Sequence, residues 1–209
     1  MKQIYLFLWA ALGVVLLSTG CSSTSAIPDG EQLYTGMKPT EYVDADKSEH
    51  ATSVREELDV VLATKPNGSL FGSPTLQSPL KIGLWIWNAF SQGTTSFDKW
   101  MVKAFGTQPV LMSYANPDLH TTVGRNLLKK RGYFNGDIDY RLVPQKNPKK
   151  MKLQYAVKMG QLWTIDTLGY VGFTPGQDSL ISAHADEAMT RSGAPFDIST
   201  LESERQRIT

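Results

Sequence analysis

The sequence has little of what most enzymes and secreted scaffolds depend on: one cysteine and three histidines among 209 residues. A single cysteine cannot form a disulfide framework. The 21 basic and 20 acidic residues give a formal net charge of +1, so no overall positive field favours nucleic acid. Because 41% of the residues are hydrophobic, the chain is too apolar to be disordered throughout. Its length suits one full domain and part of a second.

Catalytic motifs are absent from the sequence. His50, His120 and His184 lie far apart, with no spacing typical of metal ligands. There is no Gly-x-Ser-x-Gly elbow, no glycine-rich phosphate loop and no cysteine nucleophile besides Cys21. We therefore expect a protein that is not an enzyme and that uses no cofactor, metal or small-molecule substrate.

One long apolar run follows Lys2 and extends from Ile4 to Leu17. As a helix it would be about 21 Å long, which is short of the roughly 30 Å hydrocarbon core of a bilayer. This length is typical of the apolar region of a signal peptide, so residues 1–20 are excluded from the fold. The alternative is an uncleaved anchor followed by an incidental cysteine.

The residues after this run, Leu-Ser-Thr-Gly-Cys at 17–21, resemble the lipobox of bacterial lipoproteins. The resemblance implies cleavage between Gly20 and Cys21 and lipidation of Cys21 with diacylglycerol and palmitate. Several acyl chains anchor a protein to a membrane that it does not span. Ser22 stands where lipoproteins retained in the inner membrane of enteric bacteria usually carry Asp. The resemblance thus implies the outer membrane, with the chain facing the periplasm and residues 21–32 as a tether.

Hydrophobic periodicity predicts five elements in the first part of the mature chain. Residues 33–43 suit a strand that is interrupted at Lys38-Pro39, and two later strands alternate apolar and polar residues over 138–142 and 151–157. Two helices lie between the first strand and this hairpin. The first has a capping box of Ser53 and Glu56. The second starts at Asn116-Pro117, has Lys129, Lys130 and Arg131 in its last turn and ends at Gly132. Their expected apolar faces are Val54, Leu58, Val61 and Leu62 in the first helix, and Leu119, Val123, Leu127 and Leu128 in the second.

The same order of elements begins again after residue 160. Residues 162–173 suit a strand and 179–191 a helix with Leu180, Ile181 and Met189 on its inner side. A further helix is expected behind a capping box of Ser199 and Glu202. No closing hairpin follows, so we expect residues 161–209 to be an incomplete second unit.

The strand–helix–helix–strand–strand order, with Arg131-Gly132-Tyr133-Phe134 after the second helix, resembles a POTRA domain. Tandem POTRA domains form the periplasmic arm of the BamA/TamA family of outer-membrane assembly and translocation proteins, and the lipobox with a long insertion is similar to the Bacteroidetes branch. The resemblance implies an α+β fold: a βααββ unit over 33–160 with an aromatic insertion at 66–115, then a partial POTRA-like unit over 161–209. It gives residues 131–134 a structural role as a turn. It also implies protein assembly as the function, with client or partner polypeptides bound by strand addition at the sheet edge.

The insertion carries three of the tryptophans of the mature chain, Trp85, Trp87 and Trp100, and also Phe90. One interpretation is a packed insertion between the two helices. The other is a surface for a partner or for the membrane, since aromatic side chains are enriched at interfaces. The latter supports a second functional hypothesis, a structural envelope-interaction lipoprotein that uses this insertion as its contact surface.

Overall fold

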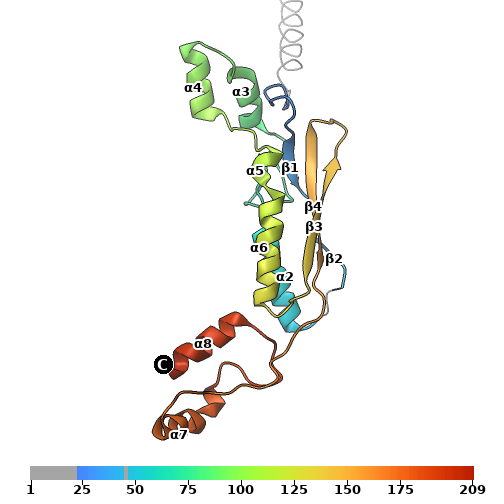
Figure 1. Cartoon of the computed structure of the whole chain (residues 1–209). Helices are drawn as coiled ribbons and strands as arrows, with labels where there is room; N and C mark the ends of the chain where they lie inside the picture. Colours follow the sequence, from blue (N-terminus) through green and yellow to red (C-terminus); the bar gives the residue numbers. More distant parts are fainter. Residues whose placement is uncertain (1–22, 45–46) are drawn as a thin grey trace, which may run out of the picture. The chain divides into compact units, whose positions relative to one another are not determined.

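The computed structural model describes residues 23–44 and 47–209 (Figure 1). The predicted signal peptide, Gly20 and Cys21 lie outside these residues. The chain divides into two compact units. Of the described residues, the first comprises 23–39, Ala63–Asn116 and Arg141–Gln154; the second comprises 40–44, 47–62, Pro117–Tyr140 and Tyr155–Thr209. The predicted domain boundaries, including the insertion limits 66–115, remain predictions.

The sheet is built around β4 (Lys150–Lys158), which pairs with each of the other three strands. In the first unit β1 (Leu33–Met37) runs parallel to the start of β4, and in the second β2 (Glu41–Tyr42) runs parallel to its end. The long strand β3 (Asp137–Pro144) forms a hairpin with β4 (Figure 1). The expected strand over 33–43 is thus two short strands with the break at Lys38-Pro39. The α+β class and the βααββ order with an open sheet are confirmed.

In the second unit α2 (Glu49–Leu62) packs against α6 (Pro117–Lys130) (Figure 1). The predicted capping box at Ser53 is wrong, because the helix begins at Glu49, five residues before Val54. Ser48 is its cap: the Ala51 N–H donates to the Ser48 hydroxyl at 3.1 Å. An N-cap side chain must accept from the first turn, and Ser53 already lies inside the helix. Val54, Leu58 and Leu62 are buried as expected, and Ala51 joins them.

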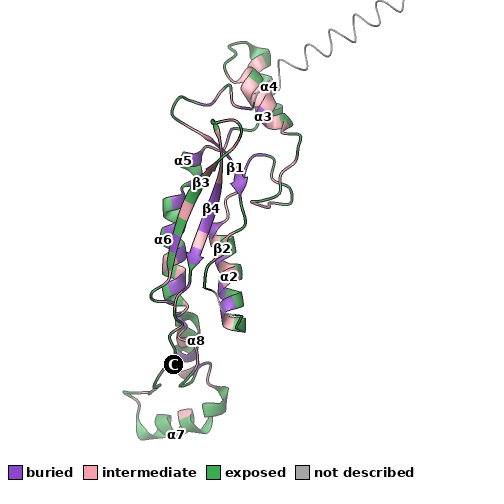
Figure 2. Cartoon of the chain, turned by 90° about the vertical axis from the view of Figure 1, so that its right-hand side faces the viewer, coloured by how far each residue is buried: buried purple, intermediate pink, exposed green. Residues whose placement is uncertain are grey.

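The buried face of α6 differs from the predicted stripe. Leu119 and Val123 are 55% and 43% exposed. Leu128 is buried as expected, and the other buried residues are Pro117, Thr121 and Gly124, which the prediction did not include. Figure 2 shows this buried stripe along one side of α6. Gly124 gives the physical reason, since a β-carbon there would lie 2.6 Å from Cδ1 of Ile138 on β3. The helix approaches the sheet on the face that has no side chain in the way.

We expect Gly124→Ala to lower the free energy of unfolding by about 1 kcal/mol. Overpacking against Ile138 costs about 1–3 kcal/mol, and the better helix propensity of Ala returns up to about 1 kcal/mol. Ile138→Val removes the clashing methyl group and by itself costs about 1 kcal/mol. Urea unfolding of the two single variants and the double variant should show that the double loses less than the sum. Simple additivity would contradict the close approach.

The insertion of the first unit holds three helices, α3 (Ile82–Phe90), α4 (Ser96–Phe105) and α5 (Met112–Ala115). Helices α3 and α4 pack against each other as a pair (Figure 1). A capping box begins α4, with Thr95 and Asp98 bonded to each other's backbone N–H groups. Leu84 is the buried residue of α3, and α4 has none, so Figure 2 draws both helices mainly as intermediate and exposed.

The last part of the second unit contains α7 (Pro175–Ala183), a short 3-10 helix (Ala185–Glu187) and α8 (Ile198–Ile208). The expected strand over 162–173 is wrong. Only Trp163–Ile165 is paired, with the Ile165 N–H donating to Ala194 O and the Phe196 N–H to Trp163 O, both at 2.9 Å. An apolar pattern becomes a strand only where a partner runs beside it, and among the described residues the pairing here is one isolated bridge.

The two helices of this segment also begin and end differently from the prediction. Thr174 and Gln177 form a capping box that starts α7 at Pro175, and the helix ends at Ala183 rather than at residue 191. Leu180 and Met189, expected on an inner side, are 63% and 57% exposed. The cap of α8 is Asp197 rather than Ser199: the Asp197 carboxylate accepts the Ser199 N–H at 2.8 Å.

One carboxylate holds this segment together. Glu204 is 3% exposed and accepts hydrogen bonds from the Tyr170 hydroxyl at 2.6 Å, the Met189 N–H at 2.8 Å and the Arg207 guanidinium at 2.7 Å. The bond from Arg207, followed by those from Tyr170 and Met189, lowers the pKa of Glu204 to about 2 against the opposing effect of burial.

The pH dependence of stability follows from this lowered pKa. Glu204 contributes stability that is complete above its unfolded-state pKa of about 4.3 and is lost as the pH falls towards about 2. We expect thermal unfolding to move to lower temperature between about pH 5.5 and about pH 2.5, and Glu204→Gln to remove part of that shift. Glu202→Gln is the matched control, because Glu202 is exposed and lies on the same helix, where it pairs with Arg205 at 2.8 Å. Equal pH profiles for both variants would contradict the assignment.

Candidate functional site

The two edges of the sheet differ in how far they are covered, and the β1 edge is closed by the insertion. The Tyr34 N–H donates to Val110 O and the Met37 N–H to Pro74 O, both at 2.9 Å. Between them, the side-chain amide of Gln77 donates to the carbonyl of Thr35. The outward backbone groups of β1 are therefore bonded within the same chain, and this edge is not a place where another strand can add.

A buried asparagine holds part of this cover in place. Asn67 is 5% exposed, donates from its side-chain nitrogen to Gln108 O at 2.7 Å and accepts the Val110 N–H at 2.7 Å. The Asn67 side chain thus bonds one carbonyl and one N–H group of the segment that covers Tyr34, as the backbone of a neighbouring strand would.

The β3 edge is arranged differently. The Gln145 N–H donates to Lys150 O at 3.1 Å, and Arg141 lies across from Gln154 with side-chain bonds of 3.0 and 3.2 Å. In an antiparallel hairpin this register turns the backbone groups of odd-numbered residues towards β4 and those of even-numbered residues outward. Within the described part of the chain no strand other than β4 pairs with β3. The outward N–H and C=O groups of Tyr140 and Leu142 therefore form an open stretch of edge.

Both ends of this open stretch are blocked. At Ile138 the N–H is taken by the carboxylate of Asp137 at 2.9 Å, and the carbonyl accepts from the guanidinium of Arg125 on α6. At the other end stands Pro144, which has no N–H to offer. Charged side chains and proline are common devices that protect sheet edges. Between them lies the short interval of β3 edge whose backbone groups turn outward.

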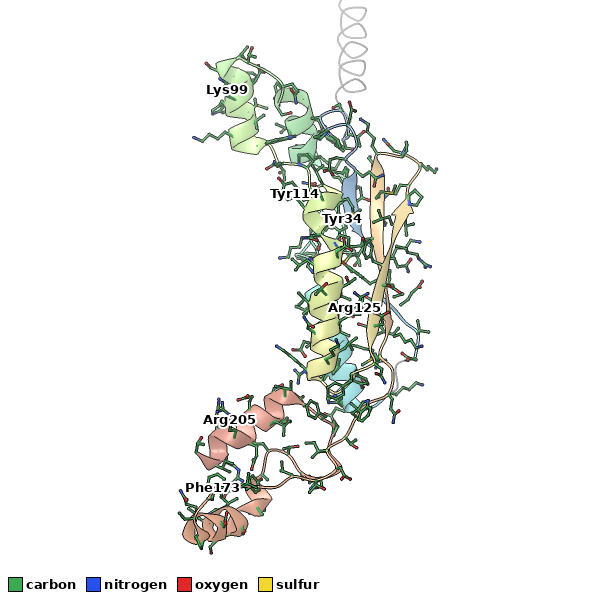
Figure 3. The ribbon with its side chains drawn as sticks, viewed as in Figure 1. Tyr34, Lys99, Tyr114, Arg125, Phe173 and Arg205 are labelled. Carbon is green, nitrogen blue, oxygen red and sulfur yellow. The ribbon has the colours of Figure 1, made fainter. Side chains whose placement is uncertain are left out.

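Electrostatics stabilise the blocked end. Nε of Arg125 lies 2.6 Å from Asp137, and its Nη2 lies 3.6 Å from Asp139 (Figure 3 labels Arg125). The hydrogen bond from Arg125 lowers the pKa of Asp137, so that carboxylate stays ionised. The Tyr140 hydroxyl donates to Asp118 at 3.0 Å, and this bond to a carboxylate raises the pKa of Tyr140. The guanidinium of Arg141, between the two residues of the open stretch, bonds to Gln154 of β4.

The predicted turn residues 131–134 lie in the second unit, where they contact the segment that follows the hairpin. Gly132 has a φ of +88°, and a β-carbon there would lie 2.6 Å from the carbonyl of Phe196. Tyr133 is buried and stacks on His50 at 5.9 Å, while the ring of Phe134 contacts those of Trp163 and Phe196.

Arg131 adds ion pairs that sequence reasoning did not find. Its guanidinium lies 2.7 Å from Glu57 and 2.5 Å from Asp197, the cap residue of α8. Burial lowers the pKa of Arg131, but its hydrogen bonds to Asp197 and Glu57 together raise it by more. The net pKa is therefore above its usual value, and the guanidinium stays charged. A single arginine thereby joins α2, the end of α6 and the start of α8.

The aromatic residues expected at a partner surface lie on α3 and α4, the helices of the insertion. Trp85, Trp87 and Phe90 are half-buried, and Trp100 is 55% exposed. The structure brings Phe90 and Trp100 into one chain of ring contacts through Phe97. Sequence reasoning missed Arg125 and Asp137 as edge residues. The sequence places Asp137 and Asp139 on one face of the strand, but it does not show that Arg125, on another element, pairs with both.

Among the described residues, no group of three or more His, Cys, Asp or Glu side chains could hold a metal ion. In the same part of the chain no helix is both long and apolar enough to cross a bilayer.

Comparisons with known proteins give few matches. No family description matches the chain, and no curated protein does. Among solved structures, the chain is similar to the crystal structure of Haemophilus influenzae BamA POTRA3-5, with a TM-score of 0.29 and 14% identity, covering 88% of this chain and 87% of that one.

Proposed function

We propose that this chain is a lipid-anchored, POTRA-like module on the periplasmic side of the outer membrane, which binds extended polypeptides at the β3 edge. The observation that carries the proposal is the difference between the two sheet edges: β1 is closed by its own insertion, while β3 has one open stretch at Tyr140 and Leu142. An added strand would gain main-chain hydrogen bonds with little dependence on its sequence.

The partner class follows from the sequence resemblance. The lipobox, the βααββ order and Arg131-Gly132-Tyr133-Phe134 support a part in outer-membrane protein assembly or translocation, as in the BamA/TamA family and its Bacteroidetes branch. The clients would then be outer-membrane polypeptides or sister assembly factors. Their strands are about ten residues long and alternate apolar and polar side chains, which suits a short open edge.

A second candidate function is that of an envelope-interaction lipoprotein that uses α3 and α4. The observation in its favour is the exposure of large apolar side chains there, with Phe97, Trp100 and Phe105 at 59%, 55% and 55%. The two candidates separate experimentally, because changes on β3 affect only the first and changes on α4 only the second.

Leu142→Pro tests the edge. Its N–H points outward, so proline removes a client bond without removing a bond to β4. We expect about tenfold weaker binding of a fluorescent ten-residue peptide with alternating apolar and polar residues, since one hydrogen bond contributes about 0.5–1.5 kcal/mol and the ring adds a steric block. Fluorescence anisotropy measures the binding.

The matched control is Leu142→Ala, which shortens the same half-exposed side chain and keeps the N–H. It should bind the peptide nearly as well as the unchanged protein, and circular dichroism should show both variants folded. Equal losses in both variants would mean that the side chain, and not the edge, binds the peptide. No binding to the unchanged protein would reject strand addition.

Cys21→Ser tests the anchor. The hydroxyl cannot carry the thioether-linked lipid, so the variant should take up no labelled palmitate and should keep residues 1–20. The unchanged protein should be labelled, should partition into detergent and should migrate faster on a gel by the mass of that signal peptide. Identical migration without label in either protein would reject the lipoprotein assignment and the outer-membrane placement.

A further inference from the structure

The α4 helix presents an apolar surface that the described chain does not cover. Phe97, Trp100 and Phe105 are each more than half exposed, and α4 has no buried residue. Their rings form a connected row with Phe90 of α3, at centroid distances of 5.9, 6.0 and 5.7 Å. We call Phe90, Phe97, Trp100 and Phe105 the aromatic row. Solitary exposed apolar residues are common, but a connected row on one helical pair is typical of a contact surface.

The start of the described chain is fixed to the same helical pair. The side-chain oxygen of Asn88 on α3 accepts the Ala26 N–H at 2.8 Å and the Ser25 hydroxyl at 3.3 Å. Ile27 follows, is 4% exposed and packs in one cluster with Leu33 and Leu84 of α3. The tether is therefore docked on α3 from Ser25 onward.

This docking limits how far α3 can lie from the proposed lipid. Three residues lie between Cys21 and Ser25, which makes four steps along the chain, and a fully extended chain spans at most about 3.6 Å per step, or about 14 Å in total. Each interfacial region of a bilayer is about 5–8 Å deep. An acylated Cys21 would thus keep Ser25, which bonds to Asn88 of α3, within about 14 Å of the lipidated residue, so that α3 and α4 can reach the lipid headgroups.

The charges of α4 suit that position. Lys99 and Lys103 are exposed, and the one acidic residue of the helix, Asp98, is used in its capping box. Figure 3 labels Lys99 on α4. Both lysines border a hollow of about 240 Å³ between α3 and α4, whose apolar side is formed by Trp87, Phe90 and Val102. Aromatic rings with lysines at their margin are the composition of helices that lie in a membrane interface, where the ammonium groups meet lipid phosphates.

We propose that α3 and α4 form a membrane-interface element that lies on the same bilayer leaflet as the lipid on Cys21, with the aromatic row inserted among the headgroups. The inference rests on the proposed lipid anchor and goes beyond it by naming the surface that meets the lipid. Because the anchor holds the pair at the membrane, insertion is an intramolecular event, and a weak apolar surface suffices. The anchored chain then has a restricted orientation on the bilayer.

Quenching of single tryptophans by brominated lipid tests the proposal. The acylated protein is reconstituted in vesicles of phosphatidylethanolamine and phosphatidylglycerol, with or without brominated acyl chains. One variant keeps Trp100 and carries Trp85→Phe, Trp87→Phe and Trp163→Phe. The control variant keeps Trp163, which is 51% exposed and lies outside the insertion, and carries Trp100→Phe in place of Trp163→Phe. Trp100 emission should shift to shorter wavelength and be lost with brominated lipid, while Trp163 emission stays unchanged.

A second pair of variants separates the aromatic row from general apolar exposure. Phe97→Ser with Phe105→Ser should abolish the quenching of Trp100. Leu119→Ser with Val123→Ser changes two exposed apolar residues of α6, which are 55% and 43% exposed, and should leave the quenching intact. Circular dichroism checks that both variants fold.

The failures are distinguishable. Protein that carries palmitate and stays on the vesicles, but whose Trp100 is not quenched, overturns the interface proposal and leaves the anchor standing. Protein without palmitate that does not bind vesicles overturns both. A photocrosslinker at position 100 that reacts in cells with a protein rather than with lipid also overturns the proposal, in favour of a protein partner.

Discussion

Strand β4 is the constraint on which the rest of the structure depends, because each of the other three strands in the described part of the chain pairs with it. β1 pairs with its first half in one unit, and β2 pairs with its second half in the other. The long crossover that parallel pairing requires contains α2 and α6. With β4 in the centre, the sheet has two outer edges that the chain must close or leave open.

The two edges are treated in different ways, and this difference is the basis of the functional proposal. On the β1 side the chain uses a long insertion, with Asn67 and Gln77 completing the cover. On the β3 side it uses only Arg125 with Asp137 at one end and Pro144 at the other. Full coverage would prevent aggregation at the cost of any strand-based recognition. A partly protected edge keeps recognition possible over a short interval.

Polar contacts, rather than a large apolar core, organise the segment after the hairpin. Arg131 pairs with Asp197 at the start of α8, and Glu204 joins Tyr170, Met189 and Arg207. Breaking such a network by removal of one partner leaves a buried charge without compensation, which is costly. These contacts are directional, so they define one arrangement of α8 against the turn at residues 131–134.

The sequence alone determined the elements whose signals are local. The helix from Pro117 to Lys130, the hairpin strands and the break at Lys38-Pro39 follow from proline, glycine and period-two patterns, which act within a few residues. Only the tertiary structure decided which face of α6 is buried, because Gly124 matters through Ile138, a residue of another element. The same reason explains the edge: Arg125 meets Ile138 and Val110 meets Tyr34 only after the chain folds. It also explains the missing strand over 162–173, since a strand exists only where a neighbour supplies its hydrogen bonds, and no local pattern can guarantee that neighbour.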